Sequence, residues 1–210
     1  MKTIAFDPVK CSLCGACSLL CSLVKSQGDV PAVPRIRIET AGNCLPLRAA
    51  VCQHCTQPAC VDACMRGIIH KDAATGIVTR QQEDCFRCAS CAVYCPVGAC
   101  AEDDATQAFV SCDLCGGDPL CVKICLSGAL QYADEREISV LSRRSYAKKT
   151  FEAPGEAPKE RTSVADLTDA QWQEICRLAA DILGKEMLPD LWRSYAAQLR
   201  NAAKEEGLHA

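Results

Sequence analysis

The sequence predicts an α+β fold in which short strand pairs and short helices repeat around clusters of cysteine. Sixteen of the 19 cysteines fall into four motifs with nearly the same internal spacing. Three of these motifs are followed, at the same distance, by a glycine and two apolar residues. Large side chains are scarce in the 210 residues, since aromatic residues make up only 5 %. Such a chain buries a thin core, so we expect bound metal to hold residues 1–133 folded.

The four cysteine motifs differ mainly in the gap between their second and third members. The third motif, which ends in Cys95-Pro96, matches the bacterial ferredoxin run that holds a 4Fe–4S cluster. At four thiolates per cluster, sixteen cysteines predict four 4Fe–4S clusters. The motifs are Cys11, Cys14, Cys17 and Cys21; Cys52, Cys55, Cys60 and Cys64; Cys85, Cys88, Cys91 and Cys95; and Cys112, Cys115, Cys121 and Cys125.

The residues between the motifs predict the strands and turns. We expect the fourth cysteine of a motif to open a short helix, and a glycine three residues later to turn the chain into a strand. Residues 77–79 and 109–111 are predicted strands that lead into the third and fourth motifs, and residues 72–76 indicate a hairpin loop. The glycines are Gly67, Gly98 and Gly128.

The spacing also predicts how the ligands are shared. The first three cysteines of a motif bind one cluster, and the fourth binds the other cluster of its pair. Spacing alone leaves open which motif pairs with which.

The layout of the four motifs, over about residues 1–133, resembles the electron-transfer subunits that accompany molybdenum and tungsten enzymes, such as those of dimethyl sulfoxide reductase and formate dehydrogenase. In that family the first motif pairs with the fourth and the second with the third. The resemblance therefore implies tandem ferredoxin-like modules in two interleaved halves, with two clusters each. It implies four ligand sets: site A (Cys11, Cys14, Cys17, Cys125), site B (Cys21, Cys112, Cys115, Cys121), site C (Cys52, Cys55, Cys60, Cys95) and site D (Cys64, Cys85, Cys88, Cys91).

The fourth motif narrows the resemblance. Its short Gly116-Gly117-Asp118-Pro119 bridge is similar to that of the small iron–sulfur subunits of tungsten-dependent aldehyde oxidoreductases and class II benzoyl-CoA reductases. It is also similar to ferredoxin-like subunits of carbon monoxide dehydrogenase and hydrogenase systems. The sequence departs from the family in one respect. In three of the four motifs the fourth cysteine is not followed by the usual proline, and we expect this to affect the turn after the motif rather than cluster binding. The residues there are Ser22, Met65 and Leu126.

The resemblance implies a non-catalytic subunit that relays single electrons to or from a large tungsten or molybdenum pterin subunit. A further flavin or ferredoxin donor or acceptor fits the same role. In keeping with this, the sequence shows no nucleophile–base pair, no nucleotide-binding glycine loop and no pterin or flavin motif. The alternatives are a subunit of a hydrogenase, formate dehydrogenase or carbon monoxide dehydrogenase system, a freestanding soluble polyferredoxin, and a scaffold with structural clusters. Zinc fits less well, because four-cysteine zinc sites use two well-separated pairs.

Several residues near the motifs have two interpretations. His54 is expected to hydrogen-bond near a cluster or face solvent, with a ligand or proton-relay role as the alternative. Three charged side chains either raise reduction potentials or are solvated surface charges, namely Arg66, Arg87 and Lys123. The cysteines outside the motifs are predicted to be small buried apolar residues rather than ligands; they are Cys44, Cys100 and Cys176.

Composition divides the chain into a four-cluster domain over residues 1–142, a linker over 143–166 and a C-terminal helical extension over 167–210. In the extension, Thr168 and Gln171 predict a capping box before a helix that ends at Gly184, and a second helix begins near Pro189. The apolar faces of this helical hairpin need a further surface, which is either the ferredoxin-like core or a partner subunit.

The overall composition predicts a cytoplasmic protein. A net charge of −3 and an isoelectric point near 5.7 argue against nucleic acid as a partner. No stretch approaches the roughly 18 apolar residues of a membrane span, and the N-terminus has no apolar segment typical of a secretion signal. So many free thiols indicate a reducing compartment.

Overall fold

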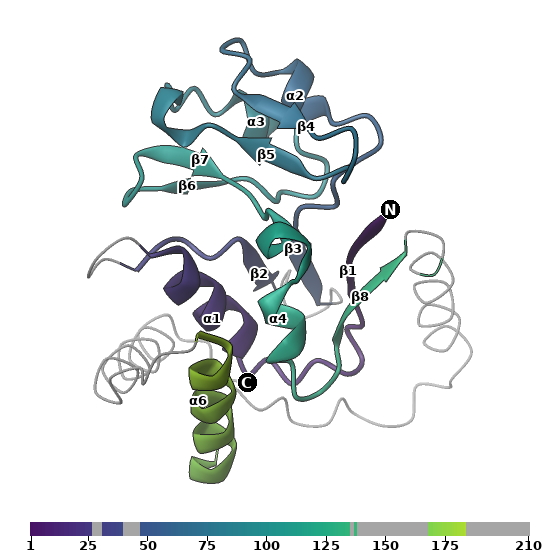
Figure 1. Ribbon diagram of the computed structural model, residues 1–210, viewed down its shortest axis with the longest axis vertical. Helices are drawn as coiled ribbons and strands as arrows, with labels where there is room; N and C mark the ends of the chain where they lie inside the picture. Colours follow the sequence, from purple (N-terminus) through teal and green to yellow (C-terminus); the bar gives the residue numbers. More distant parts are fainter. Residues whose placement is uncertain (27–30, 40–46, 135–136, 138–167, 184–210) are drawn as a thin grey trace.

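The computed structural model describes residues 1–26, 31–39, 47–134, 137 and 168–183 (Figure 1). Short elements alternate with loops, and two 3-10 turns lie at Gln82–Asp84 and Leu114–Gly117. The helices and strands are β1 (Lys2–Phe6), α1 (Ala16–Lys25), β2 (Ile36–Glu39), β3 (Arg48–Val51), α2 (Ala59–Asp62), β4 (Ile69–Lys71), β5 (Val78–Arg80), α3 (Ser90–Val93), β6 (Ala101–Asp103), β7 (Ala108–Val110), α4 (Leu120–Lys123), β8 (Leu130–Asp134) and α6 (Asp169–Leu183).

The chain folds into two halves, each built around two of the short helices. Helices α1 and α4 pack together in the lower half of Figure 1, and α2 and α3 pack together in the upper half. The lower half combines the beginning of the cysteine-rich region with its end, while the upper half is formed by the middle of the chain. The first motif therefore lies beside the fourth and the second beside the third, as the predicted interleaving requires.

Four antiparallel strand pairs frame these helices: β1 with β8, β2 with β3, β4 with β5, and β6 with β7. The β1–β8 pair, in which Lys2 faces Asp134 and Phe6 faces Leu130, joins the two ends of the domain. Sequence analysis did not predict β1, β2 or β3. Strand β5 begins one residue later than predicted and β7 one residue earlier.

The predicted hairpin between β4 and β5 is confirmed. The carboxylate of Asp72 accepts hydrogen bonds from the backbone N–H groups of Ala74, at 2.9 Å, and Thr75, at 2.6 Å. Gly76 follows with a φ of +74°, and a Cβ at this position would lie 2.6 Å from the sulfur of Met1. The left-handed backbone therefore favours glycine here, and any larger residue would also have to displace the flexible Met1 side chain.

The turns that follow the motifs confirm the role predicted for the glycines. Gly67, Gly98 and Gly128 have φ values of +64°, +62° and +63°. Their N–H groups donate to the carbonyl oxygens of the fourth cysteines over 2.9, 3.2 and 3.0 Å. The position predicted for the helices is wrong, because α2, α3 and α4 contain the third cysteine of each motif and end before the fourth. Since the fourth cysteine accepts the hydrogen bond of the glycine turn, it belongs to that turn.

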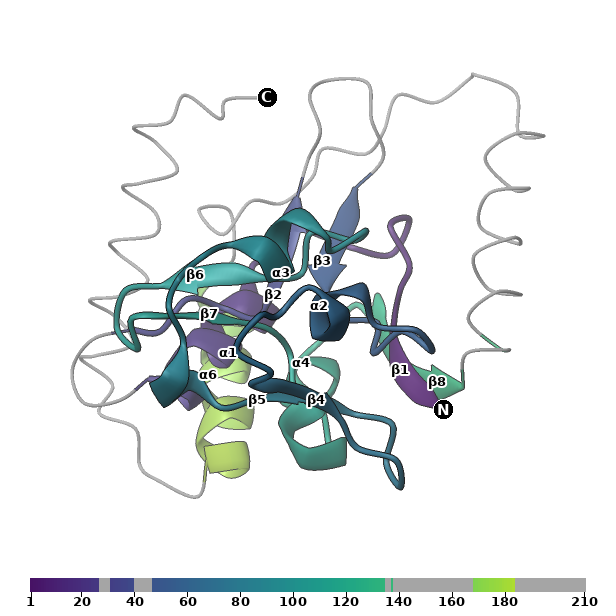
Figure 2. The same cartoon turned by 90° about the horizontal axis from the view of Figure 1, so that it is seen from above.

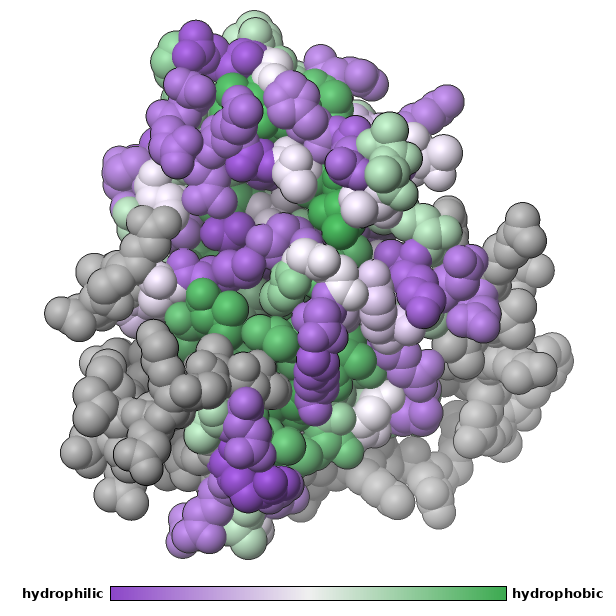
Figure 3. All heavy atoms as spheres, viewed as in Figure 1, coloured by the Kyte–Doolittle hydropathy of each residue, from purple (hydrophilic) through white to green (hydrophobic). Residues whose placement is uncertain are grey.

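Helix α6 docks on the lower half, against α1, as Figures 1 and 2 both show. Hydrophobic side chains gather over α1 and α4 in Figure 3. Ile175 and Ala179 are fully buried against a cluster that includes Leu20 and Ile124. The predicted capping box is confirmed, because the backbone N–H of Gln171 donates to Thr168 Oγ1 at 3.3 Å and the backbone N–H of Thr168 donates to Gln171 Oε1 at 3.1 Å. The docking surface of this helix is thus the ferredoxin-like core.

Several predictions fall outside the described residues. They concern Cys44, the linker, Gly184 and the second C-terminal helix near Pro189. The division of the chain at residues 142 and 166 therefore stays a prediction. Among the helices of the described segments, none combines the length and apolarity needed to cross a membrane.

We expect Ile175→Ala to weaken the docking of α6 by about 2–5 kcal/mol, because it removes a fully buried aliphatic side chain. Native-state hydrogen exchange of the α6 amides measures this free energy of opening. The matched control is Arg177→Ala, on the exposed face of the same helix, where about 0.5 kcal/mol or less is expected. Equal effects of the two variants would contradict the observed docking.

Candidate metal centre

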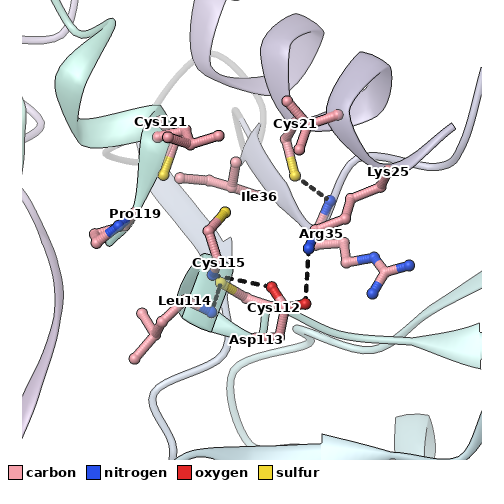
Figure 4. A pocket seen from close by; sticks show the side chains of 12 residues that line it. Cys21, Lys25, Arg35, Ile36, Cys112, Asp113, Leu114, Cys115, Pro119 and Cys121 are labelled. Atoms are coloured by element: carbon pink, nitrogen blue, oxygen red, sulfur yellow. Dashed lines mark hydrogen bonds and ion pairs between the residues drawn. The ribbon is translucent and has the colours of Figure 1, made fainter. Parts of the chain in front are cut away.

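Site B is a cavity enclosed by cysteines from three parts of the chain (Figure 4). Cys21 comes from α1, Cys121 from α4, and Cys112 and Cys115 from the loop after β7. All four line the same cavity. The thiol of Cys121 also interacts electrostatically with those of the other three. The structure thus brings the whole predicted set together.

The loop that carries two of these cysteines is tied down locally. The carboxylate of Asp113 accepts a hydrogen bond from the backbone N–H of Cys115 at 3.0 Å and pairs with Lys25 Nζ at 2.7 Å. The backbone N–H of Leu114 donates to the sulfur of Cys112 at 3.3 Å. The Lys25–Asp113 pair joins α1 to the fourth motif, and nothing in the local sequence of either residue indicates it.

The residue just before the second cysteine has a left-handed backbone in all four motifs. Leu13, His54, Arg87 and Leu114 have φ values of +60°, +48°, +54° and +54°. Such a conformation costs a non-glycine residue on the order of 1–3 kcal/mol and persists where the surroundings hold it. The same strained conformation therefore occurs at the same place in all four loops. Sequence analysis missed this feature, since none of the four residues is a glycine.

Site D is also brought together around a cavity, of about 240 Å³. Cys64, Cys85, Cys88 and Cys91 all line it, and Cys88 is exposed. The rim includes Met65 and Phe86, with exposed fractions of 87 % and 70 %. Site D is therefore more open to the surface than site B.

Within the remaining two predicted sets, electrostatic interactions connect several of the thiols. In site A the thiol of Cys17 interacts with Cys11, Cys14 and Cys125, so the set is complete. In site C the thiol of Cys52 interacts with Cys60 and Cys95. Cys55, the fourth member of site C, lies in the same loop, and its carbonyl oxygen accepts a hydrogen bond from Lys71 Nζ at 2.6 Å.

Electrostatic interactions between thiols connect each of the four sites with the next. Cys121 of site B interacts with Cys17 of site A. Cys112 of site B interacts with Cys52 of site C, and Cys60 of site C interacts with Cys91 of site D. These contacts give the order A, B, C, D.

Burial makes several thiols of sites A, B and C poor acids. Burial, together with the neighbouring thiols, raises the pKa of Cys17 to about 12 and that of Cys52 to about 11. Burial likewise raises the pKa of Cys112 and Cys121. Thiolates gathered in such surroundings are unfavourable unless a bound cation offsets their charge. This donor set fits an iron–sulfur cluster, whose binding then contributes directly to folding.

The surroundings of His54 provide a second test of whether these residues fit an iron–sulfur cluster. Its side chain is only 1 % exposed, so the interpretation as a solvent-facing residue is wrong. The backbone N–H of Val78 donates to Nδ1 at 2.9 Å, which leaves the proton on Nε2. Nε2 is buried and has no hydrogen-bond partner among the described residues. Burial lowers the pKa of His54 to about 4, so the ring is neutral. A buried N–H donor without a partner in the described part of the chain, on a residue between two predicted ligands of site C, suits a sulfur acceptor of a bound cluster.

The three charged residues predicted to lie near the clusters are all paired with carboxylates at the surface. Arg87 pairs with Glu102 and with Asp104, the latter at 3.0 Å. Arg66 lies 3.8 Å from an oxygen of Asp84 and stacks over Phe86, and Lys123 pairs with Asp118. The surface interpretation therefore describes them better than a role in tuning potentials.

The sequence predicts that Cys100 is a small buried apolar residue. In the structure, however, it makes polar contacts. Its side chain is half-buried, and its sulfur accepts a hydrogen bond from Arg80 Nη2 at 2.9 Å. It also contacts the thiols of Cys91 and Cys95 and lowers their pKa values to about 6 and about 5. Cys176 lies within α6, and its side chain is outside the described part of the structure, so its burial stays a prediction.

We expect Cys112→Ala to lower the iron content by up to four atoms per chain, because it removes one of the four ligands of site B. The control, Cys100→Ala, should keep the wild-type iron content, because Cys100 belongs to none of the four sets. Iron analysis of the anaerobically purified protein measures both. Loss of a cluster in the control alone would contradict the assignment of ligands.

Comparisons with known proteins agree with this geometry. The family described as a 4Fe-4S dicluster domain matches residues 45–135. The protein is 38 % identical, over 134 residues, to the NADH-dependent phenylglyoxylate dehydrogenase subunit beta of Aromatoleum evansii; the match covers 62 % of this sequence and only 30 % of that protein. It is 36 % identical over 124 residues to the aliphatic sulfonate oxidoreductase, polyferredoxin-like subunit, of Pyrococcus furiosus, covering 58 % of this sequence and 70 % of the relative.

A third relative matches over more of its length. The B subunit of the anaerobic dimethyl sulfoxide reductase of Haemophilus influenzae is 30 % identical over 168 residues, which covers 71 % of this sequence and 80 % of that protein. The iron–sulfur subunit of the nitrate-inducible formate dehydrogenase of Escherichia coli is 32 % identical over 108 residues, which covers 49 % of this sequence and 37 % of that subunit. The cysteine motifs, their pairing in space and these similarities agree: the chain belongs to the ferredoxin-like 4Fe–4S family that includes the iron–sulfur subunits of dimethyl sulfoxide reductase and formate dehydrogenase.

Proposed function

We propose that this chain is the electron-transfer subunit of a larger oxidoreductase and relays single electrons through four 4Fe–4S clusters at sites A to D. The observation that supports this most is the arrangement of the motif cysteines in adjoining groups, each connected with the next. A row of neighbouring one-electron centres is suited to conduction between two ends of a protein.

The chain itself holds and insulates these centres. A bound 4Fe–4S cluster supplies reversible one-electron chemistry. Backbone N–H groups donate to ligand sulfurs, from Arg35 to Cys21 at 3.2 Å and from Ala99 to Cys95 at 3.3 Å. Such bonds stabilise negative charge on the sulfur. An apolar cluster contains cysteines of sites A, B and C, and its other members limit access of water to them; these include Ile36, Val51 and Leu114.

The catalytic reaction is assigned to a partner subunit. Among the described residues, the two cavities at sites B and D are lined by the predicted ligands themselves and offer no separate substrate pocket. The partner we favour is a tungsten or molybdenum pterin enzyme, in keeping with the similarity to the B subunit of dimethyl sulfoxide reductase. We place the complex in the cytoplasm, where reducing conditions keep the thiols free.

A second candidate partner is a dehydrogenase without tungsten or molybdenum. The observation that favours it is the match to the phenylglyoxylate dehydrogenase subunit. The two candidates predict different metals in the complex, while the role of this chain is the same in both.

Elemental analysis of the anaerobically purified complex, isolated through a tag on this chain, tests the proposal. We expect about sixteen irons per chain beyond those of the partner. Tungsten or molybdenum would identify a pterin partner, and their absence from an active complex would favour the second candidate. Zinc in place of iron would overturn the electron-transfer function.

Stability of the complex distinguishes a dedicated subunit from a soluble carrier. We expect the catalytic partner to remain bound through a high-salt wash, because permanent interfaces are large and mainly apolar. The comparison is the same purification in low salt, with the ratio of the two proteins measured after each. Release of the partner by salt alone would indicate a freestanding polyferredoxin.

A further inference from the structure

Arg80 lies at the end of β5, between sites C and D, and its guanidinium is held by two hydrogen bonds. Nε donates to the hydroxyl of Ser111 at 2.8 Å, and Nη2 donates to the sulfur of Cys100 at 2.9 Å. Ser111 is 4 % exposed and follows β7, whereas Cys100 precedes β6. Three neighbouring strands therefore determine the position of this one cation.

The guanidinium is close to cysteines of both sites. It interacts electrostatically with the thiols of Cys91 in site D and Cys60 in site C. Cys52 of site C also interacts with it. Cys100, which Arg80 contacts, touches Cys91 of site D and Cys95 of site C. Arg80 further lines the cavity of site D.

Arg80 differs from Arg66 and Arg87, the other arginines near site D, in that its charge is not offset by a carboxylate. Arg66 and Arg87 both pair with acidic side chains at the surface. For Arg80, no ion pair with a carboxylate is found within the described part of the chain. Its side chain is also half-buried, so salt screens its charge less than that of an exposed arginine.

We propose that Arg80 is a positioning residue whose fixed positive charge raises the reduction potentials of the clusters at sites C and D together. This inference rests on the proposed function, because it requires clusters at both sites. Reduction adds negative charge to a cluster, and a nearby cation stabilises the reduced form more than the oxidised form. Guanidinium stays protonated across the physiological pH range, so its effect is constant. Electrons at sites C and D are thereby stabilised by the same fixed charge.

The experiment is a potentiometric titration of the anaerobically purified holo-protein, followed by electron paramagnetic resonance, with iron analysis of each sample. In Arg80→Gln we expect two of the four potentials to fall and two to stay unchanged. Comparison with Cys60→Ser and Cys91→Ser identifies the two clusters as those at sites C and D. In Arg80→Lys, which keeps the charge but loses the planar contacts, a smaller fall is expected.

The matched control is Arg87→Gln. It removes one positive charge within the motif of site D, at a surface position paired with carboxylates. All four potentials should stay at their wild-type values. An equal fall in Arg80→Gln and Arg87→Gln, or no change in Arg80→Gln at full iron content, would overturn the inference.

Two other outcomes need to be distinguished: a variant that loses iron, and a wild-type protein without reducible clusters. If Arg80→Gln assembles with less iron, Arg80→Met decides, because it removes the charge and keeps an unbranched side chain in the same place. A fall in the same two potentials then supports the inference, and unchanged potentials reject it. If the wild-type protein binds no reducible clusters, the proposed function itself fails, and this is seen before any variant is compared.

Discussion

The gathering of buried cysteine side chains is the constraint on which the rest of this structure depends. Site B combines thiols from α1 and from the fourth motif, and site A joins residues from opposite ends of the same domain. Burial and mutual proximity raise the pKa values of the inner thiols, so their thiolate forms need the charge of a bound metal cluster. Helices of only four residues and two-stranded sheets suffice as a framework because the clusters contribute the missing stability.

The loop geometry reflects the same constraint. In each motif a residue before the second cysteine has a left-handed backbone, although leucine, histidine and arginine occupy these positions instead of glycine. Strain of this kind is tolerated where ligands are positioned. In the second motif the strained residue is His54, and its conformation places the ring in the interior, with Nδ1 bonded to the backbone of β5. One local conformation thus positions a ligand loop and a buried N–H donor.

Charge is distributed unevenly around the four sites. Arg66, Arg87 and Lys123 lie close to ligands in sequence but are paired with carboxylates at the surface. Arg80 lies further from the next motif in sequence, yet it is held between two ligand sets. In the lower half, α6 covers α1 and α4 through Ile175 and Ala179. The two halves therefore differ in surroundings although their cysteine motifs are alike.

The sequence by itself determined the cysteine motifs, the turns at Gly67, Gly98 and Gly128, the hairpin at residues 72–76 and the capping box of α6. Each of these depends on residues within a few positions of one another, so local spacing and backbone preference suffice to predict it. The pairing of motifs came from a family resemblance. Only the tertiary structure decided the β1–β8 pair, the Lys25–Asp113 link, the burial of His54 and the position of Arg80. These depend on contacts between distant segments, and such contacts form only when the chain closes around its ligand sets.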